Sequence, residues 1–188
     1  SKLPFNQRAH FMTKIAEIFE KRKMEVVKAL RTEAGGWFGK SIFEASYVPE
    51  VFCAAAAMNY QSIGEVIPSE FGKLSMAIRR PVGVVSVISP WNFPAILTSR
   101  GIAFALAAGN TVVLKPSEET PYCGGLLFAE IFEEAGVPGG VLNVVTCSRD
   151  NVSVVGEELI EHPLVKGVSF TGSTAVGREI AARAGAHL

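Results

Sequence analysis

The sequence predicts an α/β protein with a Rossmann-like parallel sheet, helices on both faces of that sheet, and two amino-terminal helices before it. After Pro81, segments rich in Val and Ile alternate with helical segments. The strand segments lack the apolar and polar alternation of a sheet with one exposed face, so both faces should be covered. The chain has 188 residues, of which 48% are hydrophobic, enough for one well-buried core.

The first 80 residues predict helices and a possible hairpin arm, which we expect to belong to the same unit as the sheet. Apolar residues recur at helical spacing over 6–33, and a pair of glycines then ends the helix. A second helix is predicted over 40–62, with Pro49 as an early kink or a break. Within 63–80, the segment "KLSMAIRR" alternates as a strand of an exposed hairpin would.

Residues 81–188 predict a nucleotide-binding domain in which strands and helices alternate. The predicted strands are "VGVVSVIS", "TVVLK", "VLNVV" and "VKGVSF", and the predicted helices cover 95–108, 120–135, 151–161 and 173–184. Ligands of such sheets bind beyond the carboxyl ends of the strands. This rule selects the loops 89–94, 115–121, 146–151 and 171–177.

Composition excludes several kinds of partner. The chain has 18 basic and 18 acidic residues, so no overall charge favours nucleic acid or anionic lipid. Prolines interrupt the most apolar stretch, and we expect no membrane-spanning helix. The three cysteines follow no pairing or metal-ligand pattern, which favours a cytoplasmic protein without a metal site. The basic run 21–23 is interpreted as the solvated face of a helix.

Each of three loops admits a chemical and a structural interpretation. In "FTGSTAVG", free amides at a helix start can hold a diphosphate, although the glycine fingerprint is missing and a plain helix cap has the same composition. In "KPSEETP", Lys115 and Glu118 can grip a ribose and disfavour a 2′-phosphate, or the segment simply caps a helix. In "SPWNFP", the amide of Asn92 can stabilise an oxyanion, or it serves only the turn, and Trp91 can be core.

Four motifs, taken in order from about Arg80 to Arg178, resemble the NAD(P)-dependent aldehyde dehydrogenase superfamily. They are "RRPVGVVSVISPWNFP", "ALAAGNTVVLKPSEETP", "EEAGVPGGVLNVVT" and "FTGSTAVGR". The segments "NFPAILTSR" and "NVVTCSRDN" look closest to members that act on aromatic aldehydes of the benzaldehyde or vanillin type. The resemblance implies part of the aldehyde dehydrogenase fold, a small-molecule aldehyde substrate, NAD as cofactor with NADP as an alternative, and a homodimer or homotetramer.

The resemblance also implies the site residues. Asn92 is similar to the asparagine of the superfamily that stabilises the oxyanion. The cofactor-binding residues that it implies are Ile88, Ser89, Pro90, Trp91, Asn92, Lys115, Ser117, Glu118, Gly172, Ser173 and Val176.

In the mechanism that the resemblance implies, a cysteine thiolate attacks the aldehyde, hydride passes to the nicotinamide, and water activated by a glutamate hydrolyses the thioester. That cysteine and glutamate belong to motifs carboxyl-terminal to "FTGST", and Cys53, Cys123 and Cys147 match neither. We therefore expect a cofactor-binding fragment of an aldehyde dehydrogenase that is inactive by itself. The alternatives are a CoA-acylating or semialdehyde-type relative and a non-catalytic nucleotide-binding module.

Overall fold

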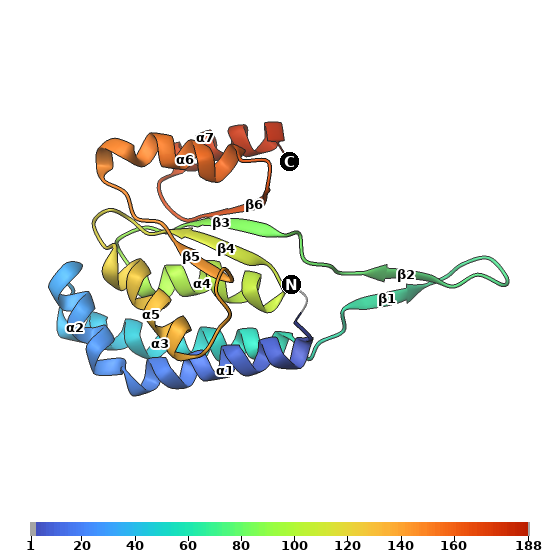
Figure 1. Cartoon of the computed structure of the whole chain (residues 1–188), viewed down its shortest axis with the longest axis horizontal. Helices are drawn as coiled ribbons and strands as arrows, with labels where there is room; N and C mark the ends of the chain where they lie inside the picture. Colours follow the sequence, from blue (N-terminus) through green and yellow to red (C-terminus); the bar gives the residue numbers. More distant parts are fainter. Residues whose placement is uncertain (1–2, 188) are drawn as a thin grey trace.

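The computed structural model describes residues 3–187, and a parallel sheet of four strands lies at its centre (Figure 1). The strands are β3 (Val84–Ile88), β4 (Thr111–Lys115), β5 (Leu142–Val144) and β6 (Val165–Phe170). Their order across the sheet is β5-β4-β3-β6, and neighbouring strands are parallel. The predicted α/β class is confirmed.

The register of the sheet brings the carboxyl ends of three strands to one edge. Ile88, the last residue of β3, lies opposite Lys115 of β4 and Phe170 of β6. The loops continue this pairing, since the amide of Ser89 donates to the carbonyl of Lys115 (3.2 Å) and the amide of Thr171 donates to the carbonyl of Ile88 (3.1 Å). Three of the loops that the sequence selected are therefore neighbours in space.

Helices cover both faces of the sheet (Figure 1). One face carries α4 (Pro94–Ala107) and α5 (Leu127–Glu134), and the other carries α6 (Val152–Glu161) and α7 (Thr174–His187). A π-helical turn, Tyr122–Leu126, precedes α5 where a continuous helix was predicted. Its Gly125 lies so close to the ring of Pro116 that a Cβ would come within 2.6 Å of it, which only glycine tolerates.

The amino-terminal helices α1 (Phe5–Lys21), α2 (Lys23–Glu33) and α3 (Phe38–Met58) form an outer layer over α4 and α5. The single helix predicted over 6–33 is wrong, because the helix breaks at Arg22 (φ −92°, ψ 13°). Within the basic run 21–23, Lys21 is exposed as predicted, whereas the side chain of Arg22 is only 18% exposed and its guanidinium pairs with Glu25 (2.6 Å) and with Glu130 of α5 (2.9 Å). The pair with Glu130 links the start of α2 to α5. Pro49 lies inside α3 without ending it.

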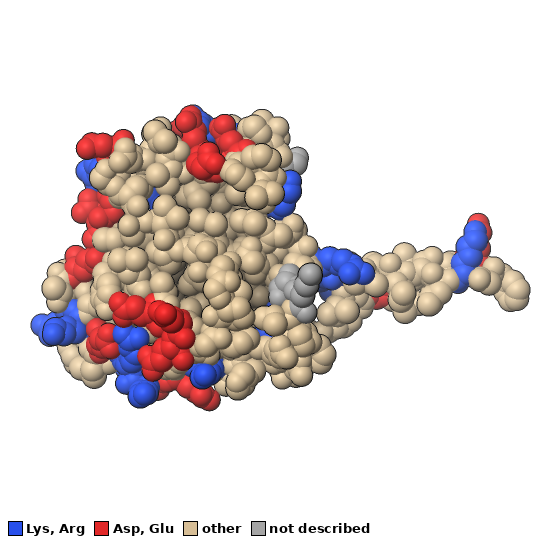
Figure 2. Space-filling view, viewed as in Figure 1, with Lys and Arg blue, Asp and Glu red and all other residues tan. Residues whose placement is uncertain are grey.

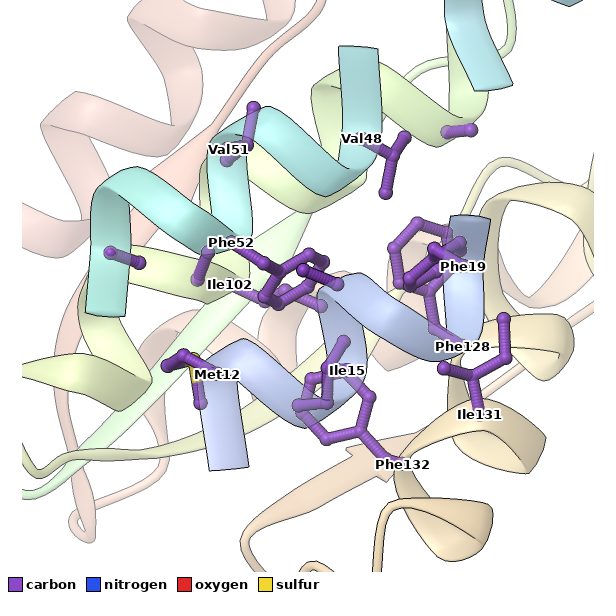
Figure 3. Close-up of a cluster of buried hydrophobic side chains, with 14 of the residues drawn as sticks. Met12, Ile15, Phe19, Val48, Val51, Phe52, Ile102, Phe128, Ile131 and Phe132 are labelled. Atoms are coloured by element: carbon purple, nitrogen blue, oxygen red, sulfur yellow. The ribbon is translucent and has the colours of Figure 1, made fainter. Parts of the chain in front are cut away.

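A cluster of buried aromatic side chains joins the outer layer to the helices on the sheet (Figure 3). The rings of Phe19 and Phe52 stack with centroids 5.7 Å apart, and Phe128 lies 5.0 Å from Phe19. These contacts connect α1, α3 and α5. The same core includes buried residues of α4 and α5, the helices that follow the loops 89–94 and 115–121.

The predicted hairpin arm is confirmed as the antiparallel pair β1 (Gly64–Ile67) and β2 (Ser75–Ile78), which extends away from the rest of the chain (Figure 1). Apolar side chains on the arm are exposed, among them Val66, Phe71 and Leu74. Charged side chains gather at the base and near the tip of the arm, and the surface between them is mostly uncharged (Figure 2). Within residues 3–187, none of the helices has the length and apolar character needed to cross a membrane.

Candidate functional site

A cavity of about 430 Å³ lies at the carboxyl edge of the sheet and extends between α6 and α7. Four of the predicted cofactor-binding residues line it: Ile88, Lys115, Glu118 and Val176. Its apolar walls come from side chains that the sequence analysis assigned no role, including Val152, Ile160, Phe170 and Ile180. The cavity thus combines apolar walls with two groups of charged side chains, one of Lys115, Glu118 and Arg149 and one of Glu157, Glu179 and Arg183.

Lys115, Glu118 and Arg149 form the charged group that contains two of the predicted residues. The ammonium of Lys115 lies 3.4 Å from Oε2 of Glu118, and Nε of Arg149 lies 3.4 Å from Oε1 of the same carboxylate. Arg149 also pairs with Glu119 (2.8 Å). The pKa of Glu118 lies below its ordinary value, first through a hydrogen bond from its own backbone amide and then through the nearby cations. Glu118 is therefore an anion at neutral pH.

Arg149 was missed as a site residue, although it belongs to the selected loop 146–151. Its side chain is exposed, and it also borders a neighbouring cavity of about 340 Å³ with Trp91, Glu119 and Thr120. The only sign of its role in the sequence was that the loop follows a predicted strand at the carboxyl edge of the sheet. Its pairing with Glu118 was invisible in the sequence because 31 positions separate the two residues.

The turn between β6 and α7 is shaped around Phe170. A Cβ added at Gly172 would overlap the ring of Phe170, and one at Gly177 would come within 3.3 Å of it. Ser173 Oγ accepts a hydrogen bond from the amide of Val176 (3.4 Å), which is the predicted helix cap. Gly172 and Ser173 are exposed at the start of α7, where the first amides of a helix lack partners within it.

The turn 89–94 is held at its first residue and exposed in its middle. The hydroxyl of Ser89 is buried and lies 2.7 Å from that of Thr98, which donates to the carbonyl of Gly124 (2.8 Å). Trp91 is 59% exposed, so its alternative interpretation as core is wrong. Asn92 is exposed beside it, next to the carboxyl edge of the sheet.

Other predicted residues lie near the cavity without lining it. Pro90 is half-buried, and Ser117 is buried with its hydroxyl accepting the amide of Glu119 (3.3 Å). The loop that contains Ser117 is supported from the outer layer by Glu33. Its carboxylate accepts the amides of Tyr122 (2.9 Å) and Cys123 (2.6 Å).

The cysteines do not contribute to this site. Cys53 is exposed on α3, Cys147 is half-buried, and Cys123 is buried. Burial raises the pKa of the Cys123 thiol, and hydrogen bonding to Glu33 adds to the shift. None of the three lines either cavity at the carboxyl edge.

Comparison with known proteins gives a family model and similar sequences of the same kind. The profile of the aldehyde dehydrogenase family matches residues 1–188. A vanillin dehydrogenase from Amycolatopsis is 45% identical over 184 residues, which are 98% of this chain and 37% of the relative. A benzaldehyde dehydrogenase from Bacillus subtilis is 42% identical over 185 residues, again 98% of this chain and 37% of the relative.

Solved structures show the same likeness. An NAD-dependent benzaldehyde dehydrogenase from Corynebacterium glutamicum superposes with a TM-score of 0.91 at 39% identity, over 97% of this chain and 39% of that protein. Similar structures include both NAD-dependent and NADP-complexed enzymes. The chain spans about 37% of the length of the curated relatives named above.

Proposed function

The chain belongs to the aldehyde dehydrogenase family, and on this premise we propose that it is the cofactor-binding part of an enzyme that oxidises an aromatic aldehyde to a carboxylic acid with NAD or NADP. One observation carries the proposal: Ile88, Lys115, Glu118 and Val176 come from separate segments and line one cavity beyond the sheet. The names of the similar vanillin and benzaldehyde dehydrogenases support the aromatic substrate.

The residues of the cavity fit the adenosine and diphosphate portions of a dinucleotide. Lys115 can donate to ribose hydroxyls and Glu118 can accept from them, while the walls between α6 and α7 offer apolar surface to a base. Gly172 and Ser173 lie at the start of α7, where backbone amides and the helix dipole favour a diphosphate. The space that a Cβ would take at Gly172 is filled by the ring of Phe170, so glycine is the residue that fits this turn.

The turn 89–94 would serve the reacting end. When bound, the nicotinamide ring supplies the acceptor for hydride. In our proposal Ser89, Pro90 and Trp91 border that ring, and the amide of Asn92 donates hydrogen bonds to the aldehyde oxygen as it becomes negative. Such a neutral donor on a rigid turn stabilises the developing charge without itself losing a proton.

Residues 1–188 alone should bind the cofactor without turning over aldehyde, because their cysteines lie away from both cavities. We further propose the division of the chain into 1–80 and 81–188, a cytoplasmic location, and a homodimer or homotetramer. The exposed apolar side chains of the arm β1–β2 support the oligomer, since surfaces of this kind are usually covered by a partner.

Cofactor binding tests the proposal directly. The chain has two tryptophans, so Trp37→Phe leaves Trp91 as the single tryptophan, which can be excited selectively. NAD or NADP should change Trp91 emission, and NAD, NADP or 5′-AMP should protect the folded chain against heat. A folded sample that shows neither response at about 1 mM ligand would contradict the proposal. A dissociation constant of about 1 mM corresponds to a binding free energy of roughly −4 kcal/mol, so even weak binding would be detected.

Turnover separates the alternatives. In a protein that contains this chain together with a nucleophilic cysteine, water-dependent formation of benzoate from benzaldehyde supports the hydrolytic enzyme. Strict dependence on CoA would favour an acylating relative, and preference for succinate semialdehyde would favour the semialdehyde type, to which a 39% identical relative belongs. Nucleotide binding without any aldehyde turnover would favour the non-catalytic module.

A further inference from the structure

Glu44 is a carboxylate in the interior of the protein. It lies on α3 and is 0% exposed. Burial of a carboxylate is unfavourable unless hydrogen bonds and a cation compensate it. Neither the predicted site nor the proposed chemistry gives this charge a role. Its role must therefore be inferred from the groups to which Glu44 is hydrogen-bonded.

The partners of Glu44 are the first free amides of α4. Its Oε2 accepts from the amides of Ala95 (2.8 Å) and Ile96 (3.3 Å), and its Oε1 pairs with the ammonium of Lys40 (3.0 Å). Pro94, at the start of α4, has no amide to satisfy, and Phe93 in the N-cap position makes no capping bond. The cap of this helix therefore comes from another helix, 51 positions earlier in the sequence.

The same ion pair touches the residue that follows Asn92. The ammonium of Lys40 lies 4.5 Å from the centroid of the Phe93 ring, in cation–π geometry. Lys40 and Glu44 thus hold both sides of the junction between the turn and α4. At the other end of the turn, the buried pair Ser89 and Thr98 holds the chain.

We propose that Glu44 is a positioning residue: by capping α4 from the outer layer, it immobilises the turn that carries Asn92. This inference rests on the proposed function, in which Asn92 meets the aldehyde oxygen. A carboxylate is suited to the task because a helix start favours negative charge, and charged acceptors form stronger hydrogen bonds than neutral ones. The amino-terminal helices would then be needed for the orientation of a catalytic amide as well as for the core.

The test is the motion of Trp91, the neighbour of Asn92, in the Trp37→Phe background. Time-resolved fluorescence anisotropy without ligand should show a larger amplitude of nanosecond motion at Trp91 in Glu44→Gln, which keeps the shape of the side chain and removes its charge. The affinity for 5′-AMP should stay within about twofold, because the adenosine end is untouched. In the intact enzyme kcat should fall about tenfold with KM for the cofactor unchanged.

Ser41→Ala is the matched control. Ser41 lies on the same helix, is equally buried, and bonds only to the carbonyls of Gly36 and Trp37. It should lower the urea midpoint without moving Trp91. If Glu44→Gln does not fold, Lys40→Met removes the same ion pair and should mobilise Trp91 to a smaller extent.

Two results would overturn the proposal: unchanged motion of Trp91 in both Glu44→Gln and Lys40→Met, or an equal increase in Ser41→Ala. Because this motion is measured without ligand, it is independent of cofactor binding. A wild-type chain that fails to bind NAD contradicts the proposed function, whereas unchanged motion of Trp91 contradicts the role of Glu44.

Discussion

The ammonium of Lys115 lies 3.4 Å from the carboxylate of Glu118, and both residues line the cavity at the carboxyl edge of the sheet. Lys115 is only 4% exposed, so the pair is shielded from solvent on one side. Arg149 adds a second cation to the same carboxylate. The balance between this anion and its two cations should decide which cofactor the site prefers.

Glu118→Gln should shift the preference toward NADP. In the wild type the carboxylate repels a 2′-phosphate, whereas in the variant Lys115 and Arg149 are free to attract it. We expect the ratio of the affinities for 2′,5′-ADP and 5′-AMP to rise about tenfold. Arg149→Ala is the opposite control and should lower the ratio. Calorimetric titration of both ligands checks this, and equal ratios in all three proteins would contradict it.

Asn92→Ala should impair catalysis and spare cofactor binding. In the intact enzyme, loss of the amide donor should lower kcat by roughly 10²–10³, as removal of one oxyanion donor usually does. Because Asn92 does not line the cavity of about 430 Å³ that we propose for adenosine, the affinity for 5′-AMP should not change. Stopped-flow measurement of NADH formation gives kcat, and calorimetric titration gives the affinity for 5′-AMP. An unchanged kcat would exclude the proposed role.

Gly172→Ala should disturb the start of α7. The new methyl group would overlap the ring of Phe170, which lines the cavity. We expect a loss of about 1–3 kcal/mol in the free energy of unfolding, together with weaker binding of 5′-AMP. Gly185→Ala, also on α7, meets no atom within 4 Å and should be neutral or stabilising by up to about 1 kcal/mol. Urea denaturation measures the free energy of unfolding of both variants. Equal values for Gly172→Ala and Gly185→Ala would contradict the overlap with Phe170.

Cys123 should make the protein less stable at alkaline pH. Burial, with a contribution from Glu33, raises the pKa of this thiol above its ordinary value near 9 in the folded state. Above that pH the unfolded chain loses the proton while the folded chain retains it, so stability falls as pH rises. Cys123→Ala should flatten the decline in urea midpoint between pH 8 and 10. The remaining slope includes Tyr122, whose pKa is also raised, mainly by burial.

Thiol labelling gives an independent check on Cys123. Cys53 is exposed and should react with a thiol reagent in the native protein, whereas Cys123 should react only on unfolding. Labelling of Cys123 at the native rate of Cys53 would show that the thiol is accessible and remove the basis of the alkaline effect.

The sequence by itself determined the class of the fold and the place of the site. Strands such as Val84–Ile88 are visible because apolar β-branched runs form buried parallel strands, and the loops that follow them must meet at one edge. This local logic singled out Lys115 and Glu118, which line one cavity, whereas Val176 was named only through the family resemblance. It failed at Arg22, where the helix breaks (φ −92°, ψ 13°) although the apolar periodicity looked continuous.

Only the tertiary structure decided the partners of the buried and paired charges. Glu118 meets Arg149 across 31 positions, and Glu44 meets Ala95 across 51. A side chain such as Glu44 reads in sequence as one more polar residue on a helix, since its spacing says nothing about which amides lie opposite. Such contacts follow from how the helices pack on the sheet, and packing is a property of the whole chain, whereas helix and strand periods are properties of short segments.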